Sequence, residues 1–119
     1  MKYLSLILLL FISFSSLSQE KKLKAYIDCR CDENYLKQET SFLEYVRDQD
    51  LADIEIFVRD VRNPTGSRSF EIKIDGNNDY KEISSSAVAV GYANDTSSTL
   101  RDKLLNKIKL ALVPFLDKG

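Results

Sequence analysis

The stretch Asp53-Ile-Glu-Ile-Phe-Val-Arg-Asp-Val61 carries the clearest periodicity in the chain. Its side chains fall into two alternating sets, Ile54, Ile56 and Val58 on one side and Asp53, Glu55, Phe57 and Arg59 on the other. A period of two is typical of a β-strand, because successive side chains point to opposite faces of a sheet. We therefore predict a strand over 53–61 with one face on a core and the other in water.

The residues after this strand predict a hairpin and one further strand. A turn signal, Asn63-Pro-Thr-Gly66, precedes a second alternating run over 69–74, in which Phe70, Ile72 and Ile74 share one side. A second turn at 75–78 leads into a weaker strand over 80–86, which can continue through Val88 and Val90. The serines at 84–86 are typical of an edge strand.

The flanking segments predict one more strand and two helices. Residues 23–29 alternate like a strand, and Asp32 can cap a helix over 33–48 whose apolar residues recur at helical spacing. From Thr96 or Ser97 onward, apolar residues fall three or four apart as in an amphipathic helix, which Pro114 should strain or end in its last turn.

The predicted fold is therefore α+β, with the order β-α-β-β-β-α. Each strand has one apolar face and each helix one apolar side, so the economical packing is a single mixed or antiparallel sheet with both helices on one face. If the strands at 23–29 and 53–61 are neighbours, they run parallel and are joined by a right-handed crossover.

The N-terminus has the order of a secretory signal peptide. Lys2 precedes an apolar run that ends in a serine-rich segment, where Ser16 and Ser18 fit a small-residue cleavage site. We predict cleavage between Ser18 and Gln19, which divides the chain into a signal peptide at 1–18 and a single domain at 19–119. The run of roughly eleven to fourteen apolar residues is too short for a membrane-spanning helix, which needs about 20. The mature chain is thus predicted to have no membrane span and to be exported to the periplasm or outer membrane.

Composition gives no support for nucleic-acid binding or for enzyme chemistry. The whole chain has 17 basic and 18 acidic residues, and removal of the signal peptide takes away Lys2. The domain is therefore slightly acidic and lacks the net positive charge typical of proteins that bind nucleic acids. The chain has no histidine and no phosphate-binding glycine loop, and paired carboxylates such as Asp53 and Glu55 lie on the wet face of a predicted strand, where a solvated charge is the ordinary explanation. We predict no catalytic residue, no cofactor and no metal ligand.

Cys29 and Cys31 are the pair of residues in the sequence that points most clearly to a specific chemistry. In an oxidising compartment two cysteines usually pair, but on one straight strand they lie about 7 Å apart, so a disulfide requires a bend at Arg30. A thiol-redox role is the alternative: the start of the next helix favours a thiolate, whereas the neighbouring Asp28 and Asp32 disfavour it. A metal site is disfavoured, because the two thiolates with Asp28 or Asp32 make an incomplete ligand set for a metal ion.

Much of the mature chain resembles an uncharacterised family of exported Gram-negative proteins. The likeness is carried by the segments Asp28 to Asp32, Tyr35 to Glu39, Phe42 to Asp48, Ala52 to Ile54, and Leu104 to Pro114. That family has a cysteine pair, a CDxxYIRxExxFVxYVRD-like segment and an LKLGLVPY-like segment, followed by a long region resembling an outer-membrane β-barrel. The present cysteines are more closely spaced and the chain ends at Gly119. The strand order also has a remote likeness to the N-terminal domain of TolB and to CsgG-like curli-secretion proteins.

These observations predict a non-enzymatic interaction or assembly module in the cell envelope. The resemblance implies a stand-alone or truncated N-terminal module of an outer-membrane protein. Phe57 and Arg59, with Tyr26 on the same side, form a candidate patch for a protein partner, and an unprotected edge strand offers a second contact. The alternative is a thiol–disulfide redox protein using Cys29 and Cys31.

Overall fold

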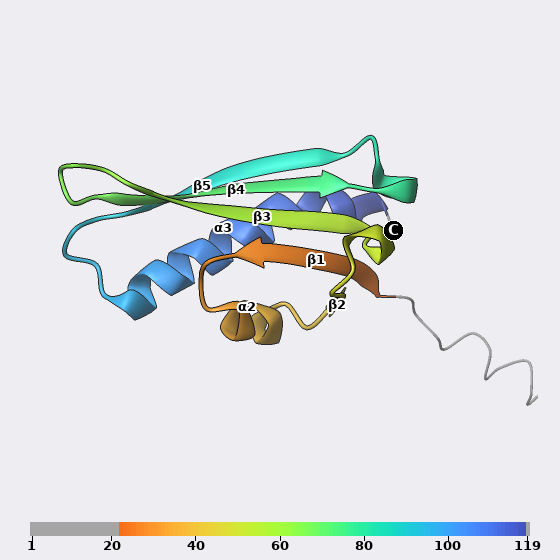
Figure 1. The fold of residues 1–119 in the computed structure, drawn as a ribbon, viewed down its shortest axis with the longest axis horizontal. Helices are drawn as coiled ribbons and strands as arrows, with labels where there is room; N and C mark the ends of the chain where they lie inside the picture. The colour runs from red at the N-terminus through yellow and green to blue at the C-terminus, as the bar shows by residue number, and fades with distance from the viewer. Residues whose placement is uncertain (1–21, 119) are drawn as a thin grey trace, which may run out of the picture.

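The molecule has two layers, a five-stranded mixed sheet and a pair of helices (Figure 1). The computed structural model describes residues 22–118, so the predicted signal peptide and the cleavage site at Ser18 and Gln19 lie outside the described residues. In chain order the elements are β1 (Leu23–Cys29), α2 (Glu33–Glu39), β2 (Leu43–Tyr45), a 3-10 turn (Gln49–Leu51), β3 (Ile54–Arg62), β4 (Arg68–Gly76), a 3-10 turn (Asn78–Tyr80), β5 (Ser84–Gly91) and α3 (Ser97–Lys118). The α+β class and the predicted order are confirmed, with the short β2 as an addition.

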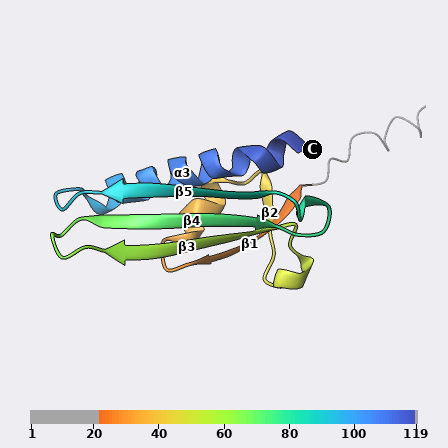
Figure 2. The ribbon, with the colours of Figure 1, turned by 90° about the horizontal axis from the view of Figure 1, so that it is seen from above.

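The sheet combines parallel and antiparallel pairing in the order β2-β1-β3-β4-β5. β1 runs parallel to both β2 and β3, and the register places Ile27 opposite Ile56. β3, β4 and β5 form an antiparallel meander in which Ile56 faces Ile74. Figure 2 shows β5, β4, β3 and β1 side by side, with α3 running along β5. The predicted parallel pairing of the first strand with the 53–61 strand is confirmed.

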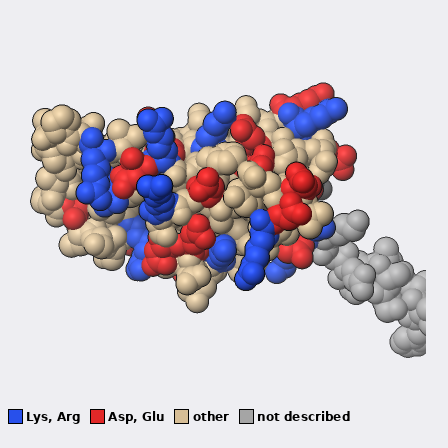
Figure 3. All heavy atoms as spheres, in the orientation of Figure 1, with Lys and Arg blue, Asp and Glu red and all other residues tan. Residues whose placement is uncertain are grey.

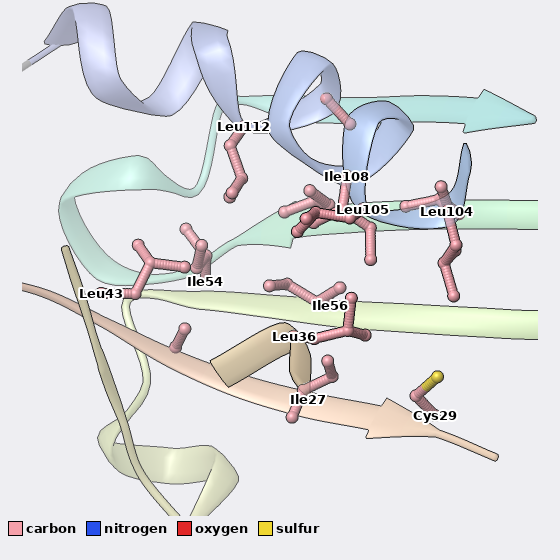
Figure 4. Close-up of a cluster of buried hydrophobic side chains, with 14 of the residues drawn as sticks. Ile27, Cys29, Leu36, Leu43, Ile54, Ile56, Leu104, Leu105, Ile108 and Leu112 are labelled. Carbon is pink, nitrogen blue, oxygen red and sulfur yellow. The ribbon is translucent and has the colours of Figure 1, made fainter. Parts of the chain in front are cut away.

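One face of the sheet and both helices share a single hydrophobic core. Leu36 of α2 and the inward residues of α3 pack over the strand isoleucines, as Figure 4 shows. The residues that are essentially inaccessible to water include Leu36, Ile54, Ile56, Ile72, Ile74, Ile108, Leu112 and Phe115. Burying side chains of this size stabilises the fold by about 1.5–3 kcal/mol each. Both helices therefore lie on one face, as predicted.

The predicted helix over 33–48 is wrong after Glu39. α2 ends where the Thr40 hydroxyl donates to the carbonyl of Leu36, and the backbone of Thr40 leaves the helical region. Leu43 then pairs with Leu23 of β1 and is only 4% exposed. Sheet pairing satisfies the backbone groups of 43–45 and buries Leu43, so tertiary packing overrides the helical spacing of this segment.

Two further boundaries differ from the sequence prediction. The last strand begins at Ser84 rather than Tyr80, because Asn78 takes a left-handed backbone conformation in the preceding 3-10 turn. α3 does not end at Pro114 but continues to Lys118. Leu112 and Phe115 are buried on either side of the proline and hold the last turn against the sheet.

Candidate functional site

The two predicted cysteines meet at the junction between β1 and α2. In the structure they are joined in a disulfide, and their Cα atoms lie 5.3 Å apart. β1 ends at Cys29, and Arg30 and Cys31 form the bend that this short spacing requires. Asp32 then caps α2 by accepting a hydrogen bond of 3.2 Å from the backbone N–H of Tyr35.

The surroundings of this disulfide are partly apolar and partly charged. Cys29 belongs to the core, whereas Cys31 is half-buried at its edge. The carboxylate of Asp32 lies 3.5 Å from the guanidinium of Arg101 on α3. Within residues 22–118, no group of three or more histidine, cysteine, aspartate or glutamate side chains is placed to hold a metal ion. The junction therefore offers a disulfide beside an ion pair.

The opposite face of the sheet carries the predicted aromatic patch. The register places Tyr26 beside Glu55, and Phe57 between Asp28 and Lys73, so Tyr26 and Phe57 lie on the same face. Neither α2 nor α3 covers this face, since both join the core on the other side. Figure 3 shows acidic and basic side chains interspersed over the face that it displays. No patch of a single charge sign dominates the face displayed there.

A shallow groove of about 630 Å³ runs over the uncovered face of β3, β4 and β5. Phe57 and Arg59 line it from β3, Lys73 lines it from β4, and the segment 84–88 lines it from β5. The groove therefore brings the predicted aromatic residue together with the last strand. It does not include Tyr26, which lies on the β1 side of the face.

β5 is the last strand of the sheet, so within residues 22–118 no other strand pairs with its outer edge, which we call the free edge. The carbonyl of Ile83 accepts a 3.0 Å bond from Gly76 of β4, whereas the carbonyl of Val90 accepts a 3.4 Å bond from the Lys103 ammonium on the other side. Donor and acceptor of one residue point the same way in an antiparallel strand, and neighbouring residues alternate. The outward-pointing backbone groups therefore belong to Ser84, Ser86, Val88 and Val90.

The side chains of Ser84, Ser86, Val88 and Val90 point to the face of the sheet that carries the groove. The segment 84–91 has no charged residue and no proline, which are the usual protections of an edge strand. Val88 and Val90 are 50% and 47% exposed, although both are apolar. The strand thus offers free backbone groups next to exposed apolar side chains.

One end of this edge is occupied by an ion pair. The Lys103 ammonium that reaches the carbonyl of Val90 also lies 2.7 Å from the Asp95 carboxylate, which accepts a 2.8 Å bond from the N–H of Tyr92. Hydrogen bonds from Lys103 and then from Tyr92 hold the pKa of Asp95 below its ordinary value. The open part of the edge therefore runs from Ser84 to Val88.

Sequence reasoning found the edge strand, Phe57 and Arg59, but missed the role of Lys103. The alternation of 84–91 was the available signal for the two faces of β5, while the position of Lys103 depends on how α3 returns along that strand. No helix within residues 22–118 is both long and apolar enough to cross a membrane. Comparison of the chain with protein-family models, curated proteins and solved structures gave no significant match.

Proposed function

We propose that this chain is an exported, non-enzymatic interaction module that binds an extended segment of a protein partner in the cell envelope. The observation that carries the proposal is the free edge of β5, where outward backbone groups stand beside exposed valines. An extended peptide that adds a strand to such an edge gains main-chain hydrogen bonds and places alternate side chains on each face.

The geometry of the edge supports a particular chemistry for the partner segment. Its backbone would bond with the outward groups of Ser84, Ser86 and Val88, and Lys103 would stop further pairing at Val90. Apolar side chains on one face of the segment would cover Val88 and occupy the groove in the direction of Phe57. The partner is therefore an extended segment of at least a few residues with alternating apolar side chains.

The envelope location rests on the N-terminal sequence and the family resemblance. Lys2, the apolar run and the serines at 16 and 18 predict export, and the resembling proteins are exported Gram-negative proteins. In that family the module precedes a membrane region, which supports a partner at the outer membrane. The lack of histidine in the whole chain supports a non-enzymatic role.

Site-specific photo-crosslinking in the cells that make this protein tests the proposal. A photoreactive side chain at Val88 should give a discrete adduct with another envelope protein, whereas the same group at the exposed Asn106 of α3 should give none. Adding Ser86→Pro should abolish the adduct, because proline removes an outward N–H. The matched change Ser86→Ala should leave the adduct intact.

Three results would contradict the proposal. The first is no adduct from Val88, and the second is an adduct that persists with Ser86→Pro. The third is an adduct of twice the chain's own mass, which would identify a second copy instead of a different partner. Detection of the unprocessed chain in the cytoplasm, with its N-terminus before Gln19, would contradict the predicted export.

A second candidate function is thiol–disulfide exchange at Cys29 and Cys31. The observation that favours it is the position of Cys31, which is half-buried in a bend and lines a cavity rather than lying in the core. The purified protein should then exchange its disulfide with a dithiol peptide, and the variant with Cys29→Ser and Cys31→Ser should not. Unchanged cellular function in that double variant would contradict the redox role and would not affect the proposal for the β5 edge.

A further inference from the structure

The helix-covered side of the molecule has a second hollow, at the end where α3 begins. A cavity of about 380 Å³ lies where the turn after β1, the start of α2, the start of β4 and the start of α3 meet. Its volume is near the lower end of the range for small-ligand pockets, about 300–1,000 Å³. It lies on the opposite side of the sheet from the groove and is independent of the β5 edge.

The inner wall of this cavity is apolar. Leu36 of α2, Phe70 of β4 and Leu104 of α3 line it, and all three belong to the core. The same core cluster continues beneath them, so an apolar group entering the cavity would pack against residues that are already fixed. A fully hydrated ion would gain nothing from this part of the cavity.

Three arginines from separate elements line the cavity. Arg30 lies in the bend after β1, Arg68 begins β4 and Arg101 belongs to the first turns of α3. The acidic residue among the lining groups is Asp32, which lies 3.5 Å from Arg101. Even when the nearby Asp60 is counted against Arg68, the three guanidinium groups exceed the carboxylates by one positive charge.

Arg68 and Arg101 are held in place by neighbouring side chains, and each keeps a donor without a partner among residues 22–118. Arg68 donates to Asp60 through Nε and Nη2, at 3.0 and 2.7 Å, which leaves its Nη1 for a ligand. Arg101 lies over the ring of Tyr35, with 3.9 Å between the guanidinium carbon and the ring centroid, and its buried Nε has no hydrogen-bond partner within residues 22–118. Arg30 is exposed and makes no ion pair within the described residues.

From this arrangement we propose that the cavity binds a small carboxylate that carries an apolar chain, such as a medium-chain alkyl carboxylate. The carboxylate is placed at the arginine rim, where a guanidinium can donate two parallel hydrogen bonds. Ser97 and Ser98 line the same rim at the start of the 22-residue α3, whose positive end favours an anion. The alkyl chain lies against Leu36, Phe70 and Leu104.

Calorimetric titration of the purified protein with octanoate tests this site, with acetate and 1-octanol as the two halves of the ligand. Octanoate should bind saturably at one site, and each half should bind at least about tenfold more weakly, because one loses the buried chain and the other the charge. Arg30→Gln should weaken octanoate binding by about tenfold. The control Arg47→Gln, at an exposed arginine outside the cavity, should leave binding unchanged.

The outcomes decide the proposal. No saturable octanoate binding, or equal binding by Arg30→Gln and the parent protein, would overturn it. Acetate binding as tight as octanoate would overturn the role of the apolar wall. Arg30 is exposed and makes no ion pair within residues 22–118, so the Arg30→Gln protein should fold, and its circular dichroism spectrum checks this directly.

Discussion

Thr40 shows how a single side chain ends a helix in this fold. Its side chain is completely buried, and its hydroxyl contacts the Leu36 carbonyl at 2.5 Å and the Tyr45 hydroxyl at 2.6 Å. Burial raises the pKa of Tyr45, while the hydrogen bond between its hydroxyl and that of Thr40 opposes this shift. The hydroxyl therefore joins the end of α2 to the last residue of β2.

Thr40→Val removes this hydroxyl and keeps the shape of the side chain. We expect the free energy of unfolding to fall by about 1–2 kcal/mol, because the half-buried Tyr45 hydroxyl loses its partner. Urea unfolding measures the loss, with the exposed Thr65→Val as the control that should change little. An equal effect of the two changes would contradict the role of Thr40.

Asp60 and Arg68 predict how stability depends on pH. The hydrogen bonds from Arg68, helped by Arg62, hold the pKa of Asp60 below its ordinary value. A carboxyl whose pKa is lowered by folding stabilises the protein above its unfolded pKa, about 3.9, and loses this contribution as the pH falls through the folded value. Asp60 therefore stabilises the domain at neutral pH and stops doing so in acid.

Asp60→Asn should lower stability at neutral pH by about 1 kcal/mol, since the pair is partly exposed to solvent. The difference should shrink as the pH falls below about 4 and disappear below the folded pKa of Asp60. Urea unfolding at neutral and acidic pH measures both quantities, with the exposed Asp50→Asn as the control. A constant difference across this range would show that the charge of Asp60 has no part in the effect.

At the scale of elements, β5 provides a test of which backbone groups point outward. The N–H of Ser86 faces the free edge, whereas the N–H of Ala87 bonds to β4. Ser86→Pro should therefore cost about 1 kcal/mol, and Ala87→Pro should cost about 3 kcal/mol or more, because it removes a ladder bond. Thermal unfolding of the two variants compares these losses, and the reverse order would place the free edge on the wrong residues.

The elements themselves were largely predictable from local pattern. The alternation around Ile54 and Ile72 predicted the central strands, since a half-buried strand needs a period of two. The segment after Glu39 was not predictable in this way, because its helical spacing competes with pairing to β1, a contact distant in sequence. The continuation of α3 past Pro114 likewise depends on the burial of Phe115.

At the scale of the whole molecule, the sheet separates two candidate sites. The uncovered face carries the groove and the free edge of β5, and the helix-covered side carries the arginine-lined cavity. The sequence indicated Phe57 and Arg59 on the uncovered face. It did not indicate that Arg30, Arg68 and Arg101 line one cavity. These arginines belong to separate elements, and only the packing of α3 beside the turn after β1 brings them together.

Amide hydrogen exchange of the purified protein, followed residue by residue by NMR, measures whether the outer edge of β5 is free. The free edge predicts an alternating pattern along β5, with the amides of Ser85, Ala87 and Ala89 protected by β4 and those of Ser84, Ser86 and Val88 exchanging rapidly. Slow exchange at all six amides would show that the edge is already covered and would contradict the account.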